Sequence, residues 1–306
     1  MDKINNSVNL VVVGSLALDT VATPAATRQD VLGGSVSYAC AAASFFTSPG
    51  MVAVAGTDFP ETGVERFRQL GIDLQGLHKV EGKTFRWSGV YEQNMNIRST
   101  LSTDLNVFAD FSPELPEVYR RSPFLFLANI APALQLQVLA QMHKPRFVAA
   151  DTMDLWIQTE RDQLMQLISK VDLLLINDSE ARHLTGKEHL VQAARQVLEW
   201  GPRYVIVKKG EHGSMLFSKS GLILVTAYPV EDVQDPTGAG DSFAGGFMGC
   251  LAASGKLTLA AVRRAMAVGT VVASFSVESF GLDRLAALTR ADIDARTAEF
   301  HKMIRV

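Results

Sequence analysis

The chain has 306 residues, 47% of them hydrophobic, which is enough for one large domain with a substantial core. Its 29 basic and 32 acidic residues give a net charge of −3 and form no long runs, which argues against binding to nucleic acid or to an anionic membrane. The two cysteines, Cys40 and Cys250, lie in apolar helical contexts typical of reduced thiols, so we expect a cytoplasmic protein. The apolar run at 8–14 is too short for a secretory signal, and no stretch of about 20 apolar residues follows, so we expect no membrane-spanning segment.

Short apolar runs alternate with helical segments over the first two thirds of the chain. The runs are continuous, as in strands covered on both faces, and lie at 10–13, 51–55, 124–127, 147–150, 173–176 and 204–207. The helical segments lie at 35–46, 60–70, 132–142, 161–170 and 190–200, and three more follow at 241–253, 258–274 and 290–303. This alternation predicts an α/β fold in one domain over 1–306, with a doubly wound, mostly parallel sheet flanked by helices.

Residues 16–32 and 83–108 do not fit this alternation. The second segment includes TFRWSGVY (84–91), where polar and apolar residues alternate without a helical period. Both segments predict a small antiparallel sheet, which could stand alone or extend the edge of the main sheet. If its side chains face a substrate, the aromatic residues favour a nucleoside base, and Arg86 or Arg98 favours an acidic or phosphorylated sugar.

The sequence DPTGAGDSFAGGF (235–247) joins a glycine-rich turn to the start of an apolar helix. Gly238, Ala239 and Gly240 are small enough for a tight turn that points several N–H groups at one anion. The N-terminus of the following helix adds a partial positive charge at the same place. Asp241 is either an N-cap or a base beside a reacting phosphate, and the Gly-Gly pair after it favours the second interpretation. The segment therefore predicts phosphoryl transfer.

This segment resembles the C-terminal motif of the ribokinase (PfkB) family of carbohydrate and nucleoside kinases. The resemblance implies ATP as the phosphoryl donor and an anion hole formed by the amides of 238–241. It also implies that Asp241 takes the proton from the acceptor hydroxyl. The implied fold is ribokinase-like, and the segments at about 16–32 and 83–108 lie where members of the family carry a β-lid that shields the reaction from water.

Two N-terminal elements extend the resemblance. GSLALD (14–19) places Asp19 past the first strand, at the edge where ligands of α/β sheets usually bind, and the family match implies that it hydrogen-bonds sugar hydroxyls. Gly33 and Gly34 open a helix, as in the family's N-terminal motif, and allow close approach of the substrate. Ribokinases continue as GGKGAN and this chain as GGSVSY, so Ser37 stands where asparagine would contact the sugar. Alone, these residues would indicate a turn and a packing helix.

Two further elements resemble the family's nucleotide and magnesium region. NDSE (177–180) follows a buried strand, so Asn177 and Glu180 are either a capping box or, as the resemblance implies, organisers of Mg²⁺, partly through water. VIVKKGEHG (205–213) resembles the turn that contacts nucleotide phosphates. The residues implied there are Lys208, which replaces the usual threonine, Gly210 and Gly213.

Asp235 and Thr237 match positions that hold a monovalent cation in several relatives, together with carbonyls of a later loop, here near 274–281. A K⁺ ion at this place could polarise the anion hole. Alternatively, Asp235 only fixes the turn before Pro236. Potassium is therefore a conditional prediction.

No clustered histidines, P-loop or Gly-x-Gly-x-x-Gly element competes with this interpretation. We expect an ATP-dependent sugar kinase that phosphorylates a primary hydroxyl. The first alternative is a nucleoside kinase, prompted by the aromatic lid residues and by the departure from the ribokinase pattern after Gly34. The second alternative is an inactive protein that senses a nucleotide or sugar. The analogy with lids that pair between subunits also suggests a homodimer.

Overall fold

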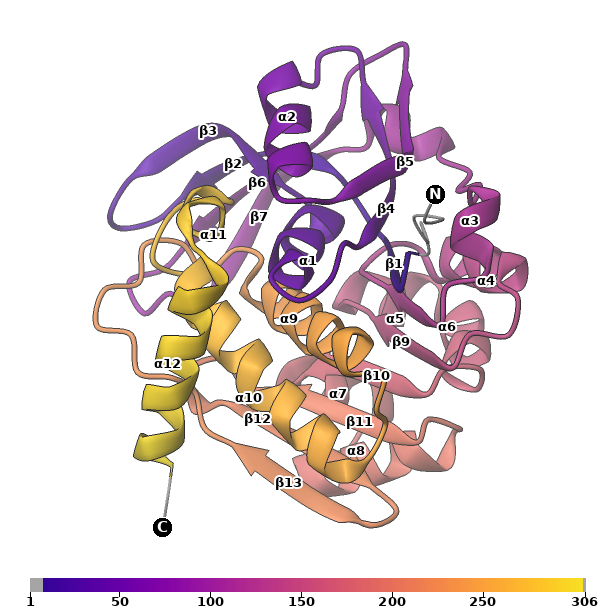
Figure 1. Ribbon diagram of the computed structural model, residues 1–306, viewed down its shortest axis with the longest axis vertical. Helices are drawn as coiled ribbons and strands as arrows, with labels where there is room; N and C mark the ends of the chain where they lie inside the picture. The colour runs from indigo at the N-terminus through magenta and orange to yellow at the C-terminus, as the bar shows by residue number, and fades with distance from the viewer. Residues whose placement is uncertain (1–7, 305–306) are drawn as a thin grey trace, which may run out of the picture.

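The computed structural model describes residues 8–304, and nine strands in this range form one large sheet (Figure 1). They are β1 (Leu10–Val13), β4 (Gly50–Gly56), β5 (Asp73–Val80), β8 (Phe124–Leu127), β9 (Phe147–Asp151), β10 (Leu173–Asn177), β11 (Tyr204–Lys208), β12 (Ser214–Ser218) and β13 (Gly221–Val225). In the order β13-β12-β11-β10-β9-β8-β1-β4-β5, neighbours are parallel from β11 to β5, and β12 and β13 add an antiparallel hairpin. The predicted mostly parallel sheet is confirmed.

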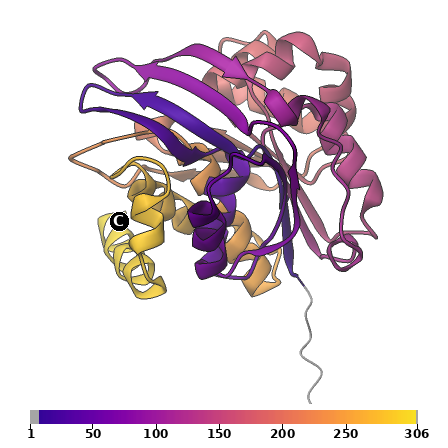
Figure 2. The same ribbon diagram turned by 90° about the horizontal axis from the view of Figure 1, so that it is seen from above.

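Helices cover both faces of this sheet (Figure 2). One face carries α1 (Ser35–Ser44), α2 (Glu61–Gln69), α9 (Ala239–Ser254), α10 (Leu259–Ser276), α11 (Asp283–Ala287) and α12 (Arg290–Met303). The other carries α3 (Glu117–Arg120), α4 (Pro132–Gln141), α5 (Asp154–Thr159), α6 (Arg161–Ile168), α7 (Asp178–Thr185) and α8 (Leu190–Glu199). Residues of β1 alternate between the two layers, since Val12 belongs to the core beneath α1 and Val13 to the core beneath α4. Burial on both faces explains the continuous apolar run.

Every predicted strand and helix is confirmed, with ends that differ by at most two residues. The largest differences include the start of α9, which is Ala239 rather than Asp241. The sequence did not predict β5, β12 and β13, or the short helices α3, α5 and α11. The apolar run of β13, LILV (222–225), was missed. Leu222 and Leu224 are exposed on this edge strand, so the run does not reflect burial on both faces.

The two irregular segments form a separate four-stranded sheet, which we call the lid. Its strands are β2 (Ala17–Ala22), β3 (Thr27–Gly33), β6 (Phe85–Tyr91) and β7 (Arg98–Asp104), in the order β3-β2-β6-β7. The β2–β3 and β6–β7 pairs are antiparallel, as predicted, and a parallel β2–β6 pair joins them. The lid projects to one side of the main sheet (Figures 1 and 2), and the alternative of an edge extension is wrong.

Within residues 8–304, one helix is long and apolar enough to span a membrane, namely α10. In the structure, 67% of its residues are buried. It packs against α9 and α12 in the helical layer (Figure 1). Its apolar character is therefore accounted for by its place in the protein core.

Candidate active site

The predicted anion cradle lies at the N-terminus of α9. Gly238 is the N-cap, in a left-handed conformation (φ 73°), and no side chain caps the helix. Asp241 is the third helical residue, so its interpretation as an N-cap is wrong. Its carboxyl group stands instead in the first turn, where free amides and the helix dipole favour anions.

The predicted set of anion-binding amides is smaller than expected. The N–H of Ala239 donates to the carbonyl of Pro236 at 3.2 Å, so this amide is already engaged. Within residues 8–304, the amides of Gly238, Gly240 and Asp241 have no such partner outside the helix, and first-turn amides have none inside it. The amide of Ala239 is therefore engaged in the turn, and the amides of the other three residues stay available as donors.

The glycines of this segment serve two different purposes. At Gly238 the left-handed backbone disfavours a side chain, and a Cβ atom would overlap the ring of Tyr38. At Gly245 a Cβ atom would overlap the backbone of α1, and at Gly246 it would press on a valine of α10 at 3.1 Å. The Gly-Gly pair after Asp241 is thus explained by close helix packing, and it does not by itself indicate a phosphate site.

The surroundings of Asp241 suit a proton acceptor. Burial raises the pKa of Asp241 to about 7, and repulsion from Asp151 acts in the same direction, while Lys208 and Arg98 oppose the rise. A carboxylate with a pKa near neutrality accepts a proton more readily than an ordinary aspartate.

Asp19 lies on lid strand β2, paired with Val31 of β3 and Trp87 of β6, and not in a turn. It is 4% exposed, and within the described residues its Oδ1 atom has no hydrogen-bond partner. Burial, and then repulsion from Asp235, raises the pKa of Asp19 to about 7. A Cβ atom at Gly33 would overlap its carboxyl group, so glycine is needed beside it. A buried oxygen without a partner is a suitable acceptor for a ligand hydroxyl.

The residues that open α1 are held by local contacts. Gly34 is the N-cap, with φ of 87°, and a Cβ atom there would overlap the carbonyl of Ser15. Ser37 is fully buried and its hydroxyl donates to the carbonyl of Gly33 at 2.7 Å, so this proton secures the glycine pair. A contact between Ser37 and a sugar stays a prediction. The next residue, Tyr38, is 1% exposed, and its hydroxyl has no partner within residues 8–304.

Asn177 and Glu180 form the capping box that was one of the two predicted alternatives. The Asn177 side chain accepts from the Glu180 amide at 2.7 Å, and Glu180 accepts from the Asn177 backbone and side chain, both at 2.7 Å. Burial raises the pKa of Glu180 to about 8, against attraction from Lys208. Because these oxygens already accept hydrogen bonds, the pair fits a Mg²⁺ ion that keeps its waters better than one bound directly.

Lys208 lies at the end of β11, and its Nζ atom donates to Oδ2 of Asp151, at the end of β9, at 2.6 Å. The two glycines that follow shape the next turn, which includes the 3-10 helix η2 (Gly210–His212). Both have positive φ, 54° at Gly210 and 82° at Gly213, and a Cβ atom at Gly213 would overlap the carbonyl of Val225. Their conformations account for these two glycines without a bound nucleotide.

Asp235 fixes the turn before α9, as in the second predicted alternative. It is fully buried, and its Oδ1 atom accepts from the Thr237 amide at 2.8 Å. Its Oδ2 atom accepts from the amide of Gly281 at 3.4 Å, which joins this turn to the predicted later loop. Burial raises the pKa of Asp235. Within residues 8–304, no cationic side chain pairs with it.

The lid contacts both ends of this site. Tyr91 of β6 accepts a hydrogen bond from the Thr237 hydroxyl at 3.1 Å. Asn96, in the β6–β7 loop, donates to Glu211 of η2 at 3.0 Å. Arg98 lies over the ring of Trp87, 5.2 Å from its centroid. Arg86, the other predicted lid cation, pairs with Asp30 and Asp58 instead.

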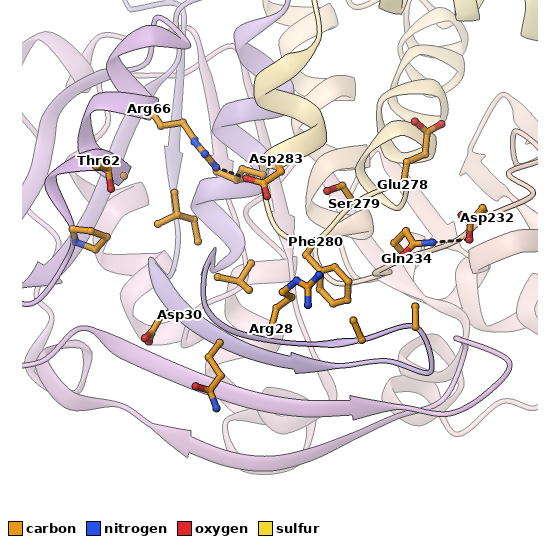
Figure 3. A pocket seen from close by; sticks show the side chains of 18 residues that line it. Arg28, Asp30, Thr62, Arg66, Asp232, Gln234, Glu278, Ser279, Phe280 and Asp283 are labelled. Carbon is orange, nitrogen blue, oxygen red and sulfur yellow. Dashed lines mark hydrogen bonds and ion pairs between the residues drawn. The ribbon is translucent and has the colours of Figure 1, made fainter.

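A separate cleft of about 810 Å³ lies between the β2–β3 hairpin, α2 and the 276–283 segment (Figure 3). Its charged side chains are largely engaged, since Arg66 pairs with Asp283 at 2.7 Å and Arg28 lies over Phe280. None of the predicted site residues lines it. The candidate active site is thus defined by the convergence of Asp19, α9 and the ends of β9 to β11.

Sequence reasoning missed Asp151 and Tyr38. Asp151 is the polar last residue of a buried strand, at the sheet edge where α/β proteins bind ligands, and this signal was available. Tyr38 gives no comparable signal, because an aromatic residue in an apolar helix usually belongs to the core.

We expect the protein without ligand to lose stability as the pH rises from about 4 to 8. The pKa values of Asp19 and Asp241 are raised to about 7 and that of Glu180 to about 8. The folded state therefore retains protons that the unfolded chain has lost. The free energy of unfolding should fall by up to about 1.4 kcal/mol per pH unit for each such proton. Urea denaturation across this range measures the slope, and a flat or rising profile would contradict the assigned environments.

The fold and the site together define a class of α/β proteins with an anion cradle under a β-lid. A family model described as "pfkB family carbohydrate kinase" matches residues 1–285, and the chain belongs to this family. It is a kinase, and thus a phosphotransferase, with a ribokinase-like fold.

Similar proteins act on nucleosides and sugars. A cytidine kinase of Thermococcus kodakarensis is 30% identical over 246 residues, which cover 78% of this chain and 87% of that protein. The solved nucleoside kinase of Methanocaldococcus jannaschii aligns with a TM-score of 0.78 at 21% identity, over 96% of this chain and 99% of that one. A putative ribokinase II of E. coli, in complex with ATP and Mg²⁺, aligns with a TM-score of 0.78 at 16% identity, over 97% and 99%.

Proposed function

We propose that this protein transfers the γ-phosphoryl group of ATP to a hydroxyl of a nucleoside, with Asp241 as the base. The main support is the position of Asp241 in the uncapped first turn of α9. There it lies beside the amides of Gly238 and Gly240, which have no backbone partner outside the helix within residues 8–304. The amides suit a phosphoryl oxygen, and the carboxylate suits an acceptor proton at the same place.

The acceptor is proposed to be a nucleoside rather than the free sugar that the sequence alone favoured. The cytidine kinase and nucleoside kinase named above support this choice. So does Ser37, because its hydroxyl proton is donated to the carbonyl of Gly33 and it lacks the amide of the asparagine that ribokinases have at this position. A free pentose or hexose remains the second candidate, since the buried Oδ1 of Asp19 would accept a hydroxyl of either compound.

In the proposed reaction, Asp241 removes the proton of the acceptor hydroxyl as its oxygen attacks the γ-phosphorus. A new P–O bond forms, the bond to the β-phosphate oxygen breaks, and ADP leaves with the electron pair. The amides of Gly238 and Gly240 bind oxygens of the transferred group and offset its charge. The lid, which contacts Thr237 through Tyr91, would keep water from competing with the acceptor.

Two cations are proposed to accompany ATP. Mg²⁺ would offset the charge of the phosphates and be held through water near Asn177 and Glu180, as the oxygens of the capping box allow. K⁺ would lie near Asp235, which is fully buried and has no cationic partner within the described residues. Replacing K⁺ by Na⁺ in the assay should then lower activity, and equal rates in both salts would exclude this potassium role.

The proposed base predicts a pH dependence of activity. Asp241 must be ionised to accept a proton, and its pKa is raised to about 7. We therefore expect kcat to rise about tenfold per pH unit below pH 7 and to level off above it. Initial rates between pH 5 and 9, with folding checked at each pH by circular dichroism, measure this profile. A rate independent of pH down to 5 would argue against Asp241 as base.

The acceptor is tested by measuring ADP release with a panel of nucleosides, pentoses, hexoses and sugar phosphates. Acceptor-dependent ADP release with a nucleoside supports the proposal, and release with free sugars alone supports the second candidate. An inactive sensor would bind nucleotide or nucleoside, seen as a raised melting temperature, without releasing ADP.

A further inference from the structure

Lys208 and Asp151 form a largely buried ion pair at the carboxyl edge of the main sheet. Their side chains are 18% and 4% exposed, and Nζ and Oδ2 are 2.6 Å apart. They come from β11 and β9, so the pair crosses the end of β10, which lies between them. The other oxygen of Asp151 accepts from the Thr152 amide at 2.9 Å. The carboxylate is thus held in place on both sides.

The ammonium group of this pair lies at the anion cradle of α9. A methyl group placed on Gly240 would be only 3.3 Å from Nζ of Lys208. Gly240 is also one of the residues whose amide is free for an anion. A fixed positive charge next to first-turn amides is a stronger anion site than the amides alone, and the charge is worth more because the ion pair is largely buried.

We propose that Lys208 contacts the transferred γ-phosphoryl group directly, and that Asp151 is the positioning residue that holds Lys208 at the cradle. This inference rests on the proposed function and replaces the general phosphate contact expected of Lys208. As the acceptor oxygen attacks and the β–γ bond breaks, the ammonium remains protonated and offsets charge on the phosphoryl oxygens. Two further acids, Glu180 and Asp241, lie near Lys208 together with Asp151. Around Lys208 there are thus three acidic side chains and one basic side chain before a phosphate binds.

Nucleotide binding separates this role from a general phosphate contact. By calorimetry, Lys208→Met should lower the affinity for AMP-PNP by about tenfold or more and that for ADP by less than about threefold, because only AMP-PNP carries a γ-phosphoryl group. Lys208→Arg, which keeps the charge, should restore part of the difference. Lys219→Met, at an exposed lysine of the β12–β13 turn, is the control and should change neither affinity. Equal losses for both nucleotides, or no loss, would overturn the proposal.

Kinetics give a second readout. Lys208→Met should lower kcat by about 10²–10³-fold with the KM of the acceptor nearly unchanged, as for loss of one oxyanion donor. If the lone Asp151 carboxylate prevents folding of this variant, the Asp151→Asn/Lys208→Met double variant, which removes both charges, carries the same test. Wild-type activity with an unaffected Lys208→Met variant refutes this inference alone, whereas a wild-type protein that transfers no phosphate refutes the proposed function.

Discussion

Replacing Asp241 by asparagine is expected to lower kcat by about 10²–10⁴-fold, the usual contribution of a general base. Asparagine has nearly the same shape but does not accept the acceptor proton. Since no side chain caps α9, the substitution removes no cap. It also removes a buried carboxylate with a raised pKa, so the melting temperature at neutral pH should stay the same or rise. Steady-state kinetics and thermal denaturation of the purified variant measure both effects.

Asp162→Asn is the matched control for this variant. Asp162 also lies in the first turn of a helix, α6, but it is exposed and remote from the cradle. Its substitution should leave both kcat and stability unchanged. A folded Asp241→Asn protein with more than about a tenth of wild-type kcat would remove Asp241 from the role of base.

Gly238→Ala is expected to abolish most of the activity and to destabilise the fold. The left-handed conformation costs a non-glycine residue about 1–2 kcal/mol, and the new Cβ atom would overlap the ring of Tyr38. Because the turn before α9 must shift to relieve this overlap, the amides of Gly240 and Asp241 lose their alignment. We expect kcat to fall by about 10²-fold or more, as when oxyanion donors are displaced.

Gly255→Ala separates the backbone cost from the effect on the site. Gly255 caps the other end of α9, is also left-handed (φ 61°), and has no atom within 4 Å of its Cβ position. Urea denaturation should show a loss of about 1–2 kcal/mol from conformation alone, with kcat unchanged. If both alanine variants kept full activity, the geometry of the turn at Gly238 would not matter for catalysis.

The main sheet was predictable because its central strands are buried on both faces. Successive residues such as Val12 and Val13 point into different cores, so both must be apolar and each strand forms one apolar run in the sequence. The edge hairpin of β12 and β13 was missed although it also contains short apolar runs, and helices of four to six residues such as α3 are too short to show a period. The central strands and the long helices were therefore predicted from their apolar patterns, and the missed elements are short helices or strands at or next to a sheet edge.

The candidate site was predictable where a motif is local in sequence, as in 235–247. Contacts between distant segments were not. Nothing in the sequence places Lys208 on Asp151 across the end of β10, or Tyr38 beneath Gly238. The hydrogen bond of Ser37 to Gly33, four residues earlier, was not foreseen either.

The most direct test measures acceptor-dependent ADP release by the wild-type protein and by Asp241→Asn, with ATP, Mg²⁺ and a panel of nucleosides and sugars. We expect the wild type to release ADP with at least one nucleoside, and the variant to retain at most about 1% of that rate at an unchanged KM. Equal rates for the two proteins, or wild-type ADP release that no acceptor increases, would contradict phosphoryl transfer centred on Asp241.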